Sequence, residues 1–211
     1  METFIMDEWK FIFKVAIIGD SGVGKSSLVQ RFTQGEVLQL DQAHSTESID
    51  FSDFSVKTFQ VEDETVKLHI WDNAGQGRLH SISPSFYLNA DALILVYDVT
   101  RQPTFDYLLH WMTEMYDKGF YDEFNMLVLV GNKCDKVDKI IPTSYGELVA
   151  NYNNMSHFLE ISARDSENVA MLFNDVAAML IWQKLRMSEL RRRETKSFIG
   201  VGRLRKWLCC F

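Results

Sequence analysis

The sequence contains little proline and little cysteine. Its 211 residues include 3 Pro, 11 Gly and 3 Cys, too few for a low-complexity chain or a disulfide scaffold. Cys134 stands alone, and Cys209 is followed directly by Cys210, an adjacent pair that rarely forms a disulfide, so we expect a reducing compartment. An uninterrupted run of about 18 apolar residues, which would predict a membrane-spanning helix, is also missing.

The N-terminal segment lacks the common targeting signals. Charged residues interrupt its apolar stretch and no small-residue cleavage site follows, so no secretory signal peptide is expected. Met1 is followed by Glu2 rather than glycine, which excludes N-myristoylation. The five histidines and Cys134 show no zinc-binding spacing, so we expect no structural zinc site.

Basic residues are scarce in most of the chain and concentrated near its end. Residues 184–206 contain nine of the 22 Lys and Arg residues but only two of the 29 Asp and Glu residues. The rest of the chain therefore carries 13 basic and 27 acidic residues. An acidic body of this kind argues against nucleic-acid binding. A basic segment attached to it favours an anionic surface as partner, and a solvated tail is the alternative.

Apolar runs of strand length alternate with helical patterns along the chain. This alternation predicts an α/β fold, with a six-stranded, mostly parallel sheet that helices cover on both faces. We expect one domain over 1–187 and a flexible basic tail over 188–211. Strands are expected at 13–18, 56–61, 66–71, 92–96, 126–130 and 158–161, and helices at 24–33, 104–116 and 169–185.

A phosphate-loop pattern, G-x-x-x-x-G-K-S, follows the first expected strand. Backbone N–H groups of such a loop surround phosphate oxygens, and the dipole of the helix that begins there adds to the attraction. Lys25 supplies positive charge, and the Ser26 hydroxyl can ligate Mg²⁺. The expected phosphate-binding residues are Gly19, Asp20, Ser21, Gly22, Val23, Gly24, Lys25, Ser26 and Ser27.

The third expected strand ends in a short polar segment, 72–76, that suits the same ligand. Asp72 can hold Mg²⁺ through water, Gly75 can offer its N–H to a terminal phosphate, and Gln76 can orient an attacking water. Taken alone, this D-x-x-G pattern is common in loops. Its position at a strand end beside the phosphate loop favours the functional interpretation.

Two further strand ends carry residues suited to guanine. In Asn132-Lys133-Cys134-Asp135, the Asp135 carboxylate can accept hydrogen bonds from N1–H and the 2-amino group, a donor pair that adenine lacks. The turn that follows the last expected strand can direct backbone N–H groups at the guanine oxygen. The expected guanine-binding residues are Asn132, Lys133, Asp135, Ser162, Ala163 and Arg164.

Together these motifs resemble the Rab family of the Ras superfamily of small GTPases. The resemblance implies a P-loop GTPase that binds GTP or GDP with Mg²⁺, hydrolyses GTP slowly and recruits effectors in vesicle traffic. It also implies a monomer served by exchange factors, GTPase-activating proteins and prenyl-binding chaperones, and an aromatic effector contact at Trp71 and Phe86, for which core packing is the alternative. The similar stretches are 13–28, 71–76, 96–100, 131–135 and 160–163.

The chain ends in Cys209-Cys210-Phe211, similar to the paired-cysteine ends on which Rab proteins receive geranylgeranyl groups. One lipid chain binds a membrane marginally, whereas two chains, or one chain with a basic segment, anchor stably. The resemblance therefore implies lipid attachment at Cys209 and Cys210. The expected location is the cytosolic face of an endomembrane.

The first nucleotide-sensing segment departs from the family pattern. A family threonine ligates Mg²⁺ and is followed by Ile-Gly, but here Thr46 is followed by Glu47-Ser48. Thr46 is the expected metal ligand beside Ser26 and Asp72, and Ser45 and Ser48 are alternatives.

The second segment departs as well. Gly77 follows the catalytic candidate Gln76 and adds backbone freedom there, while Pro84 falls within the expected second helix. Both changes favour slow or partner-dependent hydrolysis. The alternative function is a guanine-nucleotide-binding scaffold with negligible turnover.

Overall fold

The computed structural model describes residues 10–34, 54–72, 89–117 and 126–207, with side chains described up to residue 192. Its strands are β1 (Phe11–Gly19), β2 (Phe54–Val61), β3 (Glu64–Asp72), β4 (Ala92–Asp98), β5 (Met126–Asn132) and β6 (His157–Ile161). Its helices are α1 (Lys25–Gln34), α3 (Gln102–Asp106), α4 (Leu108–Asp117), α5 (Thr143–Tyr152) and α6 (Val169–Trp207).

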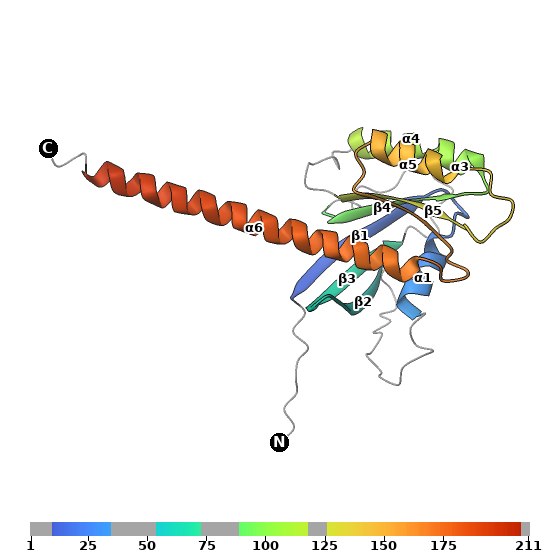
Figure 1. Ribbon diagram of the computed structural model, residues 1–211, viewed down its shortest axis with the longest axis horizontal. Helices are drawn as coiled ribbons and strands as arrows, with labels where there is room; N and C mark the ends of the chain where they lie inside the picture. The colour runs from blue at the N-terminus through green and yellow to red at the C-terminus, as the bar shows by residue number, and fades with distance from the viewer. Residues whose placement is uncertain (1–9, 35–53, 73–88, 118–125, 208–211) are drawn as a thin grey trace, which may run out of the picture.

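The six strands form one sheet in the order β2-β3-β1-β4-β5-β6. β2 and β3 pair antiparallel, and the other neighbouring strands pair parallel. α1 and α6 cover one face, and α3, α4 and α5 cover the other (Figure 1). The predicted α/β fold with a six-stranded, mostly parallel sheet is confirmed.

Strand β1 lies in the middle of the sheet and contributes to both cores. Phe13, Val15 and Ile17 pack in the core shared with α1 and α6, while Ala16 and Ile18 pack in the core shared with α4 and α5. From Val15 to Ile18 the strand is fully buried between the two cores, which explains its continuous apolar sequence there, whereas Lys14 is only partly buried.

The helices over the second face differ from the prediction. The single helix expected over 104–116 is divided at Tyr107, whose N–H is shared between the carbonyls of Pro103 and Phe105. α5 has no counterpart among the predicted helices. Its buried residues are Gly146 and Ala150, so no stripe of large apolar residues marks its inner face.

Helix α6 continues where the sequence predicts a flexible tail. It runs without a break to Trp207, and no proline follows Pro142 to end it. The flexible basic tail over 188–211 and the domain boundary near residue 187 stay predictions. Leu172 and Phe173 are fully buried, but Leu190 is 44% exposed, and Figure 1 shows the rest of α6 projecting beyond the sheet.

None of the helices in the part of the chain that the structure describes is long and apolar enough to cross a membrane.

Candidate nucleotide-binding site

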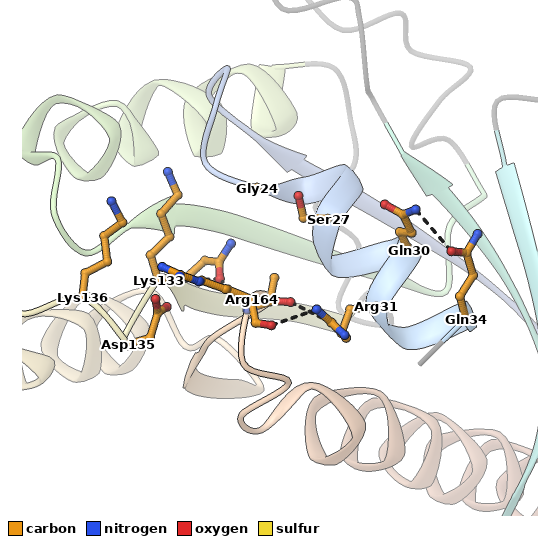
Figure 2. A pocket seen from close by; sticks show the side chains of 11 residues that line it. Gly24, Ser27, Gln30, Arg31, Gln34, Lys133, Asp135, Lys136 and Arg164 are labelled. Atoms are coloured by element: carbon orange, nitrogen blue, oxygen red, sulfur yellow. Dashed lines mark hydrogen bonds between the residues drawn. The ribbon is translucent and has the colours of Figure 1, made fainter. Parts of the chain in front are cut away.

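The ends of β1, β5 and β6 lead into one pocket of about 680 Å³ (Figure 2). The parallel arrangement of these strands places their carboxyl ends at the same edge of the sheet, where ligands bind in folds of this class. The pocket is lined by Gly24, Ser27, Gln30, Arg31, Gln34, Asn132, Lys133, Asp135, Lys136, Ala163 and Arg164.

The phosphate loop curls around the side chain of Lys25. The Lys25 ammonium donates hydrogen bonds of 2.9 Å to the carbonyl oxygens of Gly19 and Asp20. Gly24 has φ of +97°, and a Cβ there would collide with Asn132 Nδ2. Glycine is therefore required where the phosphate loop meets the guanine motif.

The charges at the phosphate end are partly buried. Burial lowers the pKa of Lys25, against the opposing effect of Asp72 and Asp20. Burial also raises the pKa of Asp72, although a hydrogen bond from Ser26 and the charge of Lys25 oppose the shift. The charged form of each group is therefore less stable here than in water.

Asp72 and Ser26 suit a divalent cation. Among the residues that the structure describes, Asp72 Oδ1 is buried without a hydrogen-bond partner, and such an oxygen is a hard ligand of the kind that Mg²⁺ prefers. The Ser26 hydroxyl bonds the same carboxyl group. No cluster of three His, Cys, Asp or Glu side chains is found in the described ranges, so a cation here needs further oxygen ligands.

Asn132 joins three predicted motifs. Its Nδ2 donates to the carbonyl oxygen of Val23 in the phosphate loop at 2.8 Å. Its Oδ1 accepts hydrogen bonds from the N–H groups of Lys133 at 2.8 Å and Ala163 at 3.1 Å. The side chain is 1% exposed, so these bonds are shielded from competing water.

Lys133 forms a second link between the motifs. Its ammonium donates to Gly22 O at 2.8 Å and to Asp98 Oδ2 at 2.6 Å. Asp98 is 1% exposed and also accepts hydrogen bonds from the N–H and hydroxyl of Thr100. Burial opposes ionisation of Asp98, but the hydrogen bonds from Lys133 and Thr100 lower its pKa overall.

The turn after β6 is held against Asp135 and α1. Ser162 Oγ donates to Asp135 Oδ1 at 2.7 Å and accepts a hydrogen bond from the N–H of Asp165 at 3.0 Å. From the other side, Arg31 of α1 donates to the carbonyl oxygens of Ala163 and Arg164 (Figure 2). The structure thus brings the described residues of the predicted phosphate loop and guanine motifs together.

Five lining or supporting residues are absent from the sequence prediction: Gln30, Arg31, Gln34, Asp98 and Lys136. Asp98 lies in the family-like stretch 96–100, which was a usable signal, whereas nothing in the local sequence marks Arg31. The side chain of the predicted residue Arg164 is 81% exposed, so it lies largely in solvent.

Cys134 makes a structural contact within the guanine motif. Its thiol donates to Glu167 Oε2 at 3.4 Å. Burial, reinforced by Glu167, raises the pKa of Cys134 to about 12. A thiol in this state is a poor nucleophile near neutral pH.

Trp71, one of the two predicted effector-contact aromatics, packs partly into the core. Its ring stacks on Phe54 with centroids 4.9 Å apart, and the ammonium of Lys14 lies 4.6 Å from its centroid. Several other predicted residues fall outside the described part of the chain and stay predictions: Ser45, Thr46, Ser48, Gly75, Gln76, Gly77, Pro84, Phe86, Cys209 and Cys210.

The part of the chain that is similar to known proteins includes every residue that lines the pocket. A model described as the Ras family matches residues 14–181. "Ras-related protein Rab-30" of Homo sapiens is 38% identical over 206 residues, 97% of each chain. "GTP-binding protein ypt1" of Schizosaccharomyces pombe is 39% identical over 196 residues, 92% of each chain. "Ras-related protein rab-11.1" of Caenorhabditis elegans is 39% identical over 198 residues, 93% of this chain and 85% of that protein.

Proposed function

Because this chain belongs to the Ras family of small GTPases, as a Rab-related member, we propose that it is a GTP-driven switch in intracellular membrane traffic. It binds GTP, recruits effectors in that state and returns to the GDP state by slow hydrolysis. The observation that carries this proposal is Asn132, whose amide joins the phosphate loop to both guanine motifs.

Guanine selectivity depends on the Asp135 carboxylate. Its Oδ1 is fixed by Ser162 Oγ at 2.7 Å, and the carboxylate can accept hydrogen bonds from N1–H and the 2-amino group of the base. Adenine offers no such donor pair, and a site that leaves a buried acceptor unpaired rejects the wrong base. Within the turn, the N–H of Ala163 donates to Asn132 Oδ1 and that of Asp165 to Ser162 Oγ, so the N–H of Arg164 is the donor that we assign to the guanine oxygen.

The phosphates bind at the amino end of α1. Lys25 exchanges its two carbonyl partners for phosphate oxygens, which removes the disadvantage of its partly buried charge. Ser26 and Asp72 would hold Mg²⁺, with Thr46 as third protein ligand and Ser45 or Ser48 as its alternatives. When bound, Mg²⁺ would neutralise negative charge on the phosphates.

Hydrolysis requires one positioned water. Gln76 orients it in line with the γ-phosphorus, a bond forms between the water oxygen and phosphorus, and the bond to the β–γ bridging oxygen breaks. The products are GDP and inorganic phosphate. Unaided members of this class are slow, so a GTPase-activating protein completes the site.

The membrane link uses the end of the chain. Geranylgeranyl groups on Cys209 and Cys210, together with the basic segment 184–206, hold the protein on the cytosolic face of an endomembrane. Exchange factors, effectors and prenyl-binding chaperones are the expected partners of a monomeric switch. Replacing both cysteines with serine should leave nucleotide binding intact and move the protein to the soluble fraction.

Single-turnover GTP hydrolysis tests the proposed switch. The wild-type protein should hydrolyse bound GTP slowly, and Gln76→Leu should reduce that rate. Thr46→Ala should weaken Mg²⁺-dependent binding of GTP more than binding of GDP. Equal affinities for GTP and GDP in both proteins, with no turnover, would replace the switch by a nucleotide-binding scaffold.

A further inference from the structure

Arg31 ties the phosphate-loop helix to the guanine turn. Its Nε donates to Ala163 O at 3.0 Å and its Nη2 donates to Arg164 O at 2.8 Å (Figure 2). Both acceptors are consecutive backbone carbonyls. The planar guanidinium presents these donors in a fixed fork, so one side chain sets the orientation of two neighbouring peptide groups.

The orientation of those peptides determines what faces the base. In a planar trans peptide, the carbonyl and the N–H point in opposite directions. With Arg164 O held toward α1, the N–H of Asp165 points to the other side, where it donates to Ser162 Oγ at 3.0 Å. That hydroxyl in turn donates to Asp135 Oδ1 at 2.7 Å, so the series reaches from Arg31 to the specificity carboxylate.

The same argument applies one peptide earlier. With Ala163 O held by Arg31, the N–H of Arg164 is directed away from α1. The N–H of Ala163 is already held by Asn132 Oδ1. The turn is thereby fixed from two sides, by Asn132 through its donor and by Arg31 through its acceptors.

We propose that Arg31 is a positioning residue for guanine recognition: it holds the turn 162–165 so that the N–H of Arg164 and the Asp135 carboxylate face the base. This inference rests on the proposed guanine-nucleotide binding. Arg31 itself makes no contact with the base in this account, and its effect passes through the backbone carbonyls that it holds.

Comparing two diphosphates separates positioning from general stability. GDP carries the guanine oxygen, N1–H and the 2-amino group, whereas purine riboside 5′-diphosphate has the same sugar and phosphates without them. Arg31→Ala should weaken GDP binding about tenfold, the factor that corresponds to one lost hydrogen-bonding contact of a charged donor. Binding of the purine riboside diphosphate should stay within about twofold, so the ratio of the two affinities falls.

Lys57→Ala is the matched control. The Lys57 ammonium donates at 2.6 Å to Phe32 O, a carbonyl of the same helix α1 that does not belong to the turn. This variant also removes a cationic side chain bonded to backbone, and it should leave the affinity ratio unchanged. Arg31→Lys keeps the charge but loses the fork, so its ratio should lie closer to that of Arg31→Ala than to wild type.

Each outcome decides the assignment. A lower ratio in Arg31→Ala and Arg31→Lys, but not in Lys57→Ala, supports it. If Arg31→Ala weakens the binding of both diphosphates equally, or changes neither affinity, Arg31 is not a positioning residue. The proposed guanine-nucleotide binding would still stand in that case. If Arg31→Ala does not fold, Arg31→Lys and Arg31→Gln provide the same comparison. An unchanged affinity ratio in both of these variants would contradict the role assigned to Arg31. A wild-type protein without preference for GDP would overturn both the inference and the proposed function.

Discussion

Asp72 and Asp98 are two partly or fully buried carboxylates at strand ends, and their surroundings shift their pKa values in opposite directions. The pKa of Asp98 is lowered because Lys133 and Thr100 more than offset its burial. The pKa of Asp72 is raised because burial outweighs the help of Ser26 and Lys25. The first carboxylate is stabilised by the protein itself, whereas the second is left with an unpartnered oxygen among the described residues.

Asp98 supports the guanine motif through Lys133, and Asp72 lies beside Ser26 and Lys25 of the phosphate loop. At the guanine end, Asn132, Asp98 and Arg31 link the motifs through hydrogen bonds within the protein. At the metal end, charges of Lys25 and Asp72 are buried with incomplete compensation. The protein's own hydrogen bonds thus hold the proposed base site, whereas we expect the proposed metal site to gain its full stabilisation when phosphate and a cation bind.

The largest expected effect is at the guanine end, for Asp135→Asn. The amide retains an oxygen that can accept from Ser162, so the turn should keep its shape. It loses the charged acceptor for N1–H and the 2-amino group, and GDP affinity should fall by roughly 100-fold or more, since bonds to charged groups contribute about 1.5–3 kcal/mol each. Preference should shift toward xanthosine diphosphate, and full retention of GDP affinity would contradict the assignment.

The next effect is on stability, for Asp98→Asn. The variant leaves the Lys133 ammonium without its anionic partner, and at pH 7 it should lower the free energy of unfolding by about 2 kcal/mol, less than for a fully buried pair because Lys133 is partly exposed. Denaturant unfolding with and without GDP measures this loss.

The pH dependence of that loss has a definite sign. Because the folded-state pKa of Asp98 is lowered, its stabilisation is present above the unfolded pKa of about 3.9 and disappears as pH falls through the folded value. The stability difference between wild type and Asp98→Asn should therefore narrow below about pH 4. A difference that widens in acid would exclude the ion pair as its source.

Asp72→Asn should change the free energy of unfolding in the opposite direction, by raising it, and by a smaller amount than Asp98→Asn lowers it. In protein stripped of nucleotide and Mg²⁺, the folded-state pKa of Asp72 is raised, so its ionised form disfavours folding above that pKa and the amide variant should be the more stable protein at neutral pH. The gap should close as pH falls through the raised pKa. The same variant should lose Mg²⁺-dependent nucleotide affinity, and a stripped variant less stable than wild type would refute this interpretation.

The smallest expected effect is for Arg164→Ala. The Arg164 side chain is 81% exposed, and its carbonyl, which accepts from Arg31, is unaffected by truncation. GDP affinity should change by less than about threefold, within the usual range for exposed substitutions. A tenfold loss, measured by the same equilibrium titration, would show that the side chain reaches the nucleotide.

The sequence predicted those parts of the site that depend on local pattern. The phosphate loop, Asn132 and Asp135 follow apolar strands at fixed spacings, and the parallel sheet brings strand ends together. Arg31 and the carbonyl of Ala163 are 132 positions apart, so their contact depends on the packing of α1 and has no local signal. Asp98 was visible within a family-like stretch, but its ion pair with Lys133 required the structure.

The helices show the same division between local and tertiary information. Strand β1 is covered on both faces and is obvious from its apolar run. In α5 the outward side chains of Leu148 and Tyr152 are 68% and 85% exposed, and the buried positions are small, so amphipathic spacing fails to mark it. α6 extends beyond the end of its apolar stripe because its later residues include good helix formers and no proline.

The most direct test of guanine-nucleotide binding is to denature the purified full-length protein and identify the nucleotide released. Chromatography of the supernatant should recover GDP or GTP in an amount close to that of the protein. The Asp135→Asn protein, purified in parallel, should release much less of either. Recovery of adenine nucleotide, or of no nucleotide from a folded wild-type protein, would contradict the account.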